Sequence, residues 1–170
     1  MFLKGVPFSL TDSVVVLEYP ETYIIEPVLG NQGYDAIVYD QAGHECDRIE
    51  IKKPHDGLER AMDGRLIIER GYGRVKCWRP GDELEPIVPF VLRTCKDCSV
   101  KDYSDCTLLV VLPVLEPFDV PEFEERFSET LAKLTEQVAG FHLRAKRVLL
   151  FIPPYRIVQV SAAQNREIRK

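Results

Sequence analysis

Two short runs of alternating apolar and polar residues lie on either side of a turn-forming segment in the first third of the chain. The runs are residues 34–39 (YDAIVY) and 46–52 (CDRIEIK), and residues 40–45 (DQAGHE) separate them. Alternation with a period of two is typical of a half-buried strand, and Asp and Gly between two such runs favour a tight connection. The pattern predicts a β-hairpin.

Other apolar runs predict further strands. Residues 107–114 (TLLVVLPV) are almost continuously apolar, which is typical of a central strand covered on both faces. Residues 19–29 contain Pro27, which would break a long helix, so this segment fits either a short helix or a strand. Three more runs rich in β-branched or aliphatic residues also predict strands: 13–17, 147–152 and 155–160.

Helical periodicity is clearest near the C-terminal end, in residues 122–139. One apolar stripe runs along this segment, and Gly140 follows it as a stop signal; the stripe consists of Phe123, Phe127, Leu131, Leu134 and Val138. Residues 57–70 also predict a helix, with Asp56 and Glu59 at capping-box spacing. Asp63–Gly64 is also a turn dipeptide, which leaves a strand over 65–69 as the alternative.

The segment between these two helices, residues 73–102, is rich in Pro, Gly and Cys, and we expect one or two short strands there. Strand, hairpin, helix, strand, helix and strand then follow one another along the chain. This order predicts an α/β fold, with a mixed sheet that has a central β-hairpin and is flanked by helices. No linker separates two cores, so residues 1–170 are expected to form a single domain.

Composition narrows the class of protein. Apolar residues make up 45% of the chain and charged residues 29%, which is typical of a globular domain. We expect no membrane span and no export signal, hence a cytoplasmic protein whose five cysteines are reduced thiols. The net charge of −5 argues against a protein that coats nucleic acid nonspecifically, because that binding depends on neutralising phosphates.

The predicted hairpin places three polar residues near one another. In antiparallel strands joined near Gly43, residues whose numbers sum to about 85 face each other, so Asp35 should lie opposite or diagonal to Glu50. Lys52 is two residues beyond Glu50 and therefore on the same face. Two neighbouring carboxylates can bind a hard divalent cation, and an ammonium group can stabilise charge on a phosphate oxygen. The residues thus indicate phosphodiester cleavage.

With these three residues the chain resembles the PD-(D/E)XK nuclease superfamily, and the matching stretch is residues 33–53 (GYDAIVYDQAGHECDRIEIKK). The resemblance implies a restriction-endonuclease-like fold, Asp35 and Glu50 as Mg²⁺ ligands and Lys52 as the catalytic lysine. Tyr34 stands where the family usually has Pro. The family often adds a carboxylate from a preceding helix, for which Glu21 or Glu26 would serve. The expected substrate is DNA or RNA.

His55, just beyond this stretch, is either a base at the site or an exposed loop residue. A second candidate site is the Cys95-Lys-Asp-Cys98 segment, which has the spacing of half a structural zinc site. Cys77 and Cys106 are the thiolates that would complete it, and packed or loop thiols are the alternative.

Two readings of the Asp35, Glu50 and Lys52 pattern stay open. One is a Mg²⁺-dependent nuclease-like domain, and the other is a non-catalytic α/β module that interacts with a partner and retains a nuclease-like fold. Alternating Glu and Lys are also common on the solvated face of a sheet, which fits the second reading. The sequence does not identify a protein partner or an oligomeric state.

Overall fold

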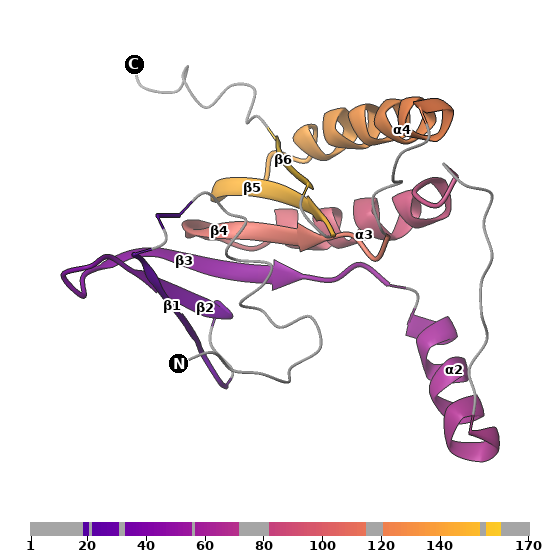
Figure 1. Ribbon diagram of the computed structural model, residues 1–170, viewed down its shortest axis with the longest axis horizontal. Helices are drawn as coiled ribbons and strands as arrows, with labels where there is room; N and C mark the ends of the chain where they lie inside the picture. Colours follow the sequence, from indigo (N-terminus) through magenta and orange to yellow (C-terminus); the bar gives the residue numbers. More distant parts are fainter. Residues whose placement is uncertain are drawn as a thin grey trace.

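The computed structural model describes residues 19–20, 22–30, 33–55, 57–71, 82–114, 121–153 and 156–160. The fold is built on one six-stranded sheet, in which the strands lie side by side in the order in which they occur along the chain (Figure 1). The strands are β1 (Ile24–Pro27), β2 (Ala36–Tyr39), β3 (Glu45–Lys52), β4 (Tyr103–Val111), β5 (Ala145–Ile152) and β6 (Arg156–Val160). The strand predicted over residues 13–17 lies outside the described residues.

The sheet is mixed, which confirms the predicted α/β fold class. Strands β1, β2 and β3 are antiparallel, β3, β4 and β5 are parallel, and β6 returns antiparallel to β5. The predicted hairpin is β2–β3, and its register agrees with the expected one because Ala36 pairs with Ile49 and Ile37 with Arg48. A parallel strand needs a long crossover, and helices provide it between β3 and β4 and between β4 and β5.

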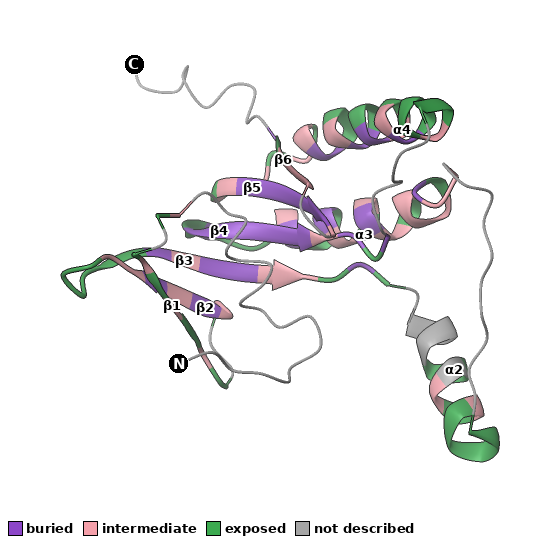
Figure 2. Cartoon of the chain, viewed as in Figure 1, coloured by how far each residue is buried: buried purple, intermediate pink, exposed green. Residues whose placement is uncertain are grey.

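Two helices cover one face of the sheet. Helix α4 (Pro121–Ala139) buries four of the five residues of its predicted stripe, and Phe123 is half-buried. Helix α3 (Val88–Ser99) contributes Val91, Cys95 and Cys98 to the same core. The sheet contributes Leu108, Val110, Leu150, Ile152 and Val160 to this core, together with Leu112 directly after β4. This helix-covered face therefore holds the larger hydrophobic core (Figure 2).

The opposite face of the sheet has a smaller core. Its buried residues come from strands β2 to β5: Ala36, Val38, Ile49, Leu109, Leu149 and Phe151. The side chains of Tyr19 and Tyr23 pack against them from the segment before β1. On β3, Ile49 and Ile51 contact this smaller core, whereas Arg48, Glu50 and Lys52 between and beside them point to the other face, which explains the period-two pattern of the sequence.

The third helix, α2 (Gly57–Arg70), agrees with the predicted helix and excludes the alternative strand over 65–69. Figure 1 shows it extending away from the sheet. Its apolar side chains are largely exposed: Met62 is 54% exposed, Ile67 55% and Ile68 86%. Asp56, which was expected to cap this helix, lies outside the described residues.

The prediction of short strands over 73–102 was wrong for its described part. Residues 85–87 form a 3₁₀ turn that leads directly into α3. Pro86 and Pro89 are the second residues of these two elements, within the first turn, where a proline is tolerated because its missing N–H has no intrahelical partner to lose. The two prolines therefore mark the start of a helix here rather than a loop.

Residues 19–29 take the strand alternative, since β1 pairs with β2 along four residues. Glu26 consequently lies on a strand and not on a helix before the hairpin. Within the described part of the chain, no helix combines the length and apolar character that crossing a membrane requires.

Candidate functional site

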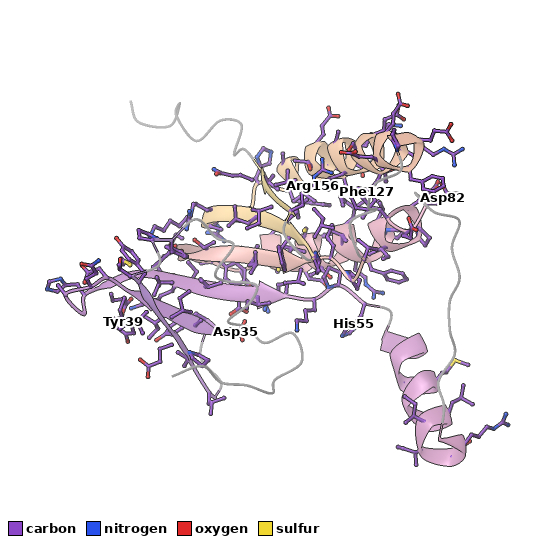
Figure 3. The ribbon with its side chains drawn as sticks, viewed as in Figure 1. Asp35, Tyr39, His55, Asp82, Phe127 and Arg156 are labelled. Atoms are coloured by element: carbon purple, nitrogen blue, oxygen red, sulfur yellow. The ribbon has the colours of Figure 1, made fainter. Side chains whose placement is uncertain are left out.

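Asp35 directly precedes β2, and Glu50 lies near the end of β3. The N–H of Asp35 donates a hydrogen bond of 2.7 Å to the carbonyl of Ile49, the residue that Ala36 faces in the β2–β3 pair. Asp35 is thus hydrogen-bonded to the residue next to Glu50. Ile49 belongs to the smaller core, so the side chain of Glu50 is on the helix-covered face. Figure 3 labels Asp35.

Each of the two carboxylates has one oxygen engaged. Oδ2 of Asp35 accepts a hydrogen bond of 2.7 Å from the N–H of Ile51. Oε1 of Glu50 forms an ion pair with the ammonium group of Lys52. Within the described part of the chain, Oδ1 of Asp35 and Oε2 of Glu50 have no hydrogen-bond partner. Two carboxylate oxygens are therefore available for another ligand.

Aromatic and thiol side chains surround this pair. The ammonium group of Lys52 lies 6.0 Å from the ring centroid of Tyr103, within the range of a cation–π contact. The hydroxyl of Tyr103 donates to Sγ of Cys98 at 3.9 Å. Burial raises the pKa of both the Tyr103 phenol and the Cys98 thiol, so both groups are protonated at neutral pH. Glu50 itself is only 8% exposed, and its charge is balanced mainly by Lys52.

Three further residues were inferred from the sequence as supporting the site: Glu21, Glu26 and His55. Glu26 is exposed on β1, opposite Ile37, and Glu21 lies outside the described residues. His55 is exposed beyond the end of β3, and its carbonyl accepts a hydrogen bond of 3.3 Å from Arg93 of α3 (Figure 3). Among the described residues, no three His, Cys, Asp or Glu side chains gather in an arrangement that could hold a metal ion. A cation at Asp35 and Glu50 would thus have two protein carboxylates and water as ligands.

The described cysteines of the zinc hypothesis are buried in the helix-covered core. Cys95 and Cys98 lie on α3 and Cys106 on β4. Burial raises the pKa of both Cys95 and Cys106 to about 12, so these thiols remain protonated and pack as small apolar side chains. Cys77, which would contribute a further ligand, lies outside the described residues, and the zinc site stays a prediction.

A buried carboxylate on the other face of β3 was missed by the sequence reasoning. Asp47 is 5% exposed and accepts hydrogen bonds from side chains of three other segments. Its donors are the hydroxyl of Tyr19, Oγ1 of Thr107 at 2.8 Å, Nη2 of Arg147 at 2.9 Å, Nζ of Lys146 at 3.1 Å and the N–H of Arg48 at 3.0 Å. We call these residues the Asp47 cluster.

The hydrogen-bond donors around Asp47 determine the ionisation of its carboxyl group. Burial alone would raise the pKa of Asp47, but the hydrogen bonds from Tyr19, Thr107, Lys146 and Arg147 outweigh it and the pKa lies below the ordinary value. The same burial and the neighbouring Asp47 carboxylate raise the pKa of the Tyr19 phenol. Asp47 is therefore an ionised, fully hydrogen-bonded carboxylate that joins β3, β4, β5 and the segment before β1.

Comparison with known proteins does not assign this chain to a family. No family model and no curated protein matches this chain. Among solved structures, the chain has a weak similarity to SfsA of Pyrococcus furiosus, in a structure with Ca²⁺, at 15% sequence identity and a TM-score of 0.20. The match covers 82% of this chain, which spans about half (53%) of the length of that protein.

Proposed function

We propose that the protein is a Mg²⁺-dependent nuclease in which Asp35 and Glu50 bind the cation and Lys52 is the catalytic lysine. The observation that supports this proposal is that Asp35 is hydrogen-bonded to Ile49 and Ile51, the two neighbours of Glu50 on β3, and that Lys52 forms an ion pair with Glu50. Each acid also keeps one carboxylate oxygen that no described residue binds. Under this proposal the three side chains would supply two acidic ligands and one cation.

The available donors suit Mg²⁺. This ion prefers hard oxygen ligands and usually binds proteins through one or two carboxylates, with water completing its octahedral shell. Oδ1 of Asp35 and Oε2 of Glu50 match that requirement. When bound, Mg²⁺ would neutralise charge on a phosphate oxygen and make a bound water more acidic.

Lys52 is held where a phosphate would approach. Its ammonium group lies between Glu50 and the ring of Tyr103, which limits the directions in which it can point. In the free protein it balances the charge of Glu50, and with a cation on Glu50 it can donate instead to a phosphate oxygen. The net charge of −5 favours contact with a few phosphates near the cut over a long duplex footprint.

The test compares wild type with Glu50→Gln, which keeps the shape of the side chain and removes its charge. Asp105→Asn is the matched control, because Asp105 is an acidic residue of the neighbouring strand β4 whose side chain is 61% exposed. Each protein is incubated with single- and double-stranded DNA and RNA, in Mg²⁺, in Mn²⁺ and in EDTA. We expect wild type and Asp105→Asn to cleave in the presence of metal and Glu50→Gln to be slower by about a hundredfold or more. Equal cleavage by all three proteins, or by none, would contradict the proposal.

A non-catalytic binding module is the second candidate function. It is favoured by the burial of Glu50 and by the fact that both acids already have a partner, Lys52 in one case and the N–H of Ile51 in the other. A carboxylate satisfied within the protein can be a structural remnant of a site. This candidate predicts no cleavage of any substrate and no response of either carboxylate to Mg²⁺, whereas the nuclease predicts both.

A further inference from the structure

A groove runs between α4 and β6, on the helix-covered face and distant in the sheet order from the β2–β3 hairpin. Its volume is about 520 Å³, which is in the size range of ligand-binding clefts. Its walls are largely apolar, with Leu131, Ala132 and Ala139 from the helix and Val158 from the strand. Figure 1 shows α4 lying alongside β6.

The strand that borders this groove is the last one in the sheet. Within the described part of the chain, β6 pairs with β5 on one side and with no strand on the other. An edge strand presents a row of backbone N–H and C=O groups that can pair with another extended segment. A segment added there would continue the sheet beneath α4.

The side chains of β6 show where those of an added strand would go. Val158 packs against the core under α4, whereas Ile157 packs against the smaller core on the other face. Side chains alternate in the same way on a neighbouring strand, so every second side chain of an added segment would enter the groove. The groove is apolar at the level of Leu131, Ala139 and Val158, which suits aliphatic side chains at those alternate positions.

Opposite charges mark the two ends of the groove. At one end Arg156, at the start of β6, donates a hydrogen bond of 3.4 Å to Oγ of Ser128 on α4. At the other end the groove is lined by Glu136 of α4 and by Gln159 of β6. A segment antiparallel to β6 would have its C-terminal end beside Arg156 and its N-terminal end beside Glu136. An acidic residue at the C-terminal end of the segment and a basic residue at its N-terminal end would complement these charges.

We propose that the groove between α4 and the edge of β6 binds an extended peptide of a partner protein by strand addition. The peptide runs antiparallel to β6, places aliphatic side chains at alternate positions under α4, and carries a basic residue near its N-terminal end and an acidic residue near its C-terminal end. The backbone pairs with the strand edge, and the groove selects the side chains. This inference does not depend on the nuclease proposal, because no residue of the groove belongs to the hairpin site.

The test uses a defined probe on the full chain. The probe is the synthetic peptide Lys-Thr-Val-Thr-Val-Thr-Asp with blocked ends, and binding is followed through amide chemical shifts in NMR spectra and through fluorescence anisotropy. We expect saturable shifts that are confined to β6 and to the second half of α4. Methylating the backbone nitrogens that would pair with β6 should weaken binding by about tenfold or more, because the ladder hydrogen bonds are lost.

Two pairs of variants sharpen the test. Ala132→Arg places a large side chain in the groove at an exposed helix position, and Gln137→Arg makes the same change at an exposed position of α4 outside the groove. We expect only Ala132→Arg to abolish binding of the probe. Exchanging the end charges through Arg156→Glu and Glu136→Arg together should shift preference to the peptide with Asp first and Lys last.

Several outcomes would overturn the inference. Shifts that avoid β6 and α4, or their absence at the highest soluble peptide concentration, would show that the groove does not take an extended peptide. Equal binding of the N-methylated probe would assign the groove to small apolar ligands rather than to strand addition. Dimers in sedimentation experiments that Ala132→Arg dissociates would assign it to a second copy of this chain.

Discussion

Strand β3 carries two buried carboxylates, Asp47 and Glu50, that face opposite sides of the sheet and have very different surroundings. Asp47 lies over the smaller core and accepts hydrogen bonds from four side chains and one backbone N–H. Glu50 lies on the helix-covered face, and among the described residues its carboxylate has one partner, Lys52. Both are buried, at 5% and 8% exposure, so burial does not distinguish them. The two carboxylates differ in the number of hydrogen-bond donors that contact them.

The number of donors separates a structural acid from an acid that can bind a ligand. Asp47 has no capacity left for a cation, and the two cations near it, Lys146 and Arg147, would repel one. Within the described residues, Glu50 keeps one oxygen without a hydrogen-bond partner, and Asp35 is hydrogen-bonded to both of its neighbours on β3. We therefore assign Asp47 to the stability of the fold and Glu50 to the proposed chemistry, and this division can be tested one residue at a time.

The largest effect is expected from Asp47→Ala. The change leaves Arg147, Lys146, Thr107 and Tyr19 without their shared acceptor, and loss of one partner of a buried ion pair usually costs several kcal/mol. Because the side chains of Lys146 and Arg147 are 46% and 33% exposed, water can solvate them in part. We expect the free energy of unfolding to fall by about 3 kcal/mol in urea denaturation. Asp105→Ala on β4 is the control, with a change within about 0.5 kcal/mol, and equal losses would contradict the assignment.

Acid should remove the same stabilisation in wild type. The pKa of Asp47 is below its ordinary value of 3.8 in the folded protein, so its ionised form stabilises the fold at every pH above that value. The contribution is lost as the pH falls below 3.8 toward the lower pKa of the folded state. The difference in unfolding free energy between wild type and Asp47→Asn, measured from pH 7 to pH 2, should therefore shrink below pH 4. The other acids with a lowered pKa, such as Asp40 and Asp102, are common to both proteins and cancel. A difference that does not change with pH would show that the charge of Asp47 is not involved.

A smaller effect is expected from Thr107→Val, which keeps the shape of a fully buried side chain and removes one donor to Asp47. The lost hydrogen bond should lower the free energy of unfolding by about 1–2 kcal/mol, since Asp47 is charged. In an Asp47→Asn background the same change should cost less, because the two residues share one network. Full additivity of the two substitutions would separate Thr107 from the cluster.

The smallest effect on stability is expected from Glu50→Gln. Glu50 is buried, so Glu50→Gln also removes the cost of desolvating its charge, and Lys52, whose side chain is 26% exposed, stays partly hydrated. The net loss should therefore be about 0.5–1 kcal/mol. Thermal unfolding of Glu50→Gln and of Lys52→Met, each compared with wild type, measures the loss of this ion pair when one or the other partner is changed. A loss as large as that of Asp47→Ala would make Glu50 a structural residue and would remove the contrast between the two acids.

The sequence predicted those parts of the fold whose signals are local. Period-two alternation located the β2–β3 hairpin and its register, and the stripe of α4 located that helix. The sequence did not predict helix α3, because Pro86 and Pro89 resemble loop residues and because the spacing of Cys95 and Cys98 fits metal ligands as well as apolar residues on one helix face. Which of two roles a proline or a cysteine takes depends on packing, which a single sequence does not show.

The hairpin that carries the candidate residues could be predicted from the sequence for the same local reason. A single turn brings Asp35 to the backbone of Ile49 and Ile51, and Lys52 follows Glu50 by two residues on β3. The metal site itself stays a prediction. The Asp47 cluster could not be predicted from the sequence, because its donors Tyr19, Thr107 and Arg147 come from three segments that meet only in the folded sheet. In the strand sequence Asp47 and Glu50 look alike, and only the tertiary contacts tell them apart.

The measurement that tests this account most directly is a Mg²⁺ titration of the folded protein, followed by NMR of the side-chain carboxyl carbons. We expect the signals of Asp35 and Glu50 to shift together and to saturate, and the signal of Asp47 to stay in place because its oxygens are already bound. In Glu50→Gln the response of Asp35 should weaken or vanish. Unchanged signals of Asp35 and Glu50 throughout the titration, or a response of Asp47 equal to theirs, would contradict the proposed metal site.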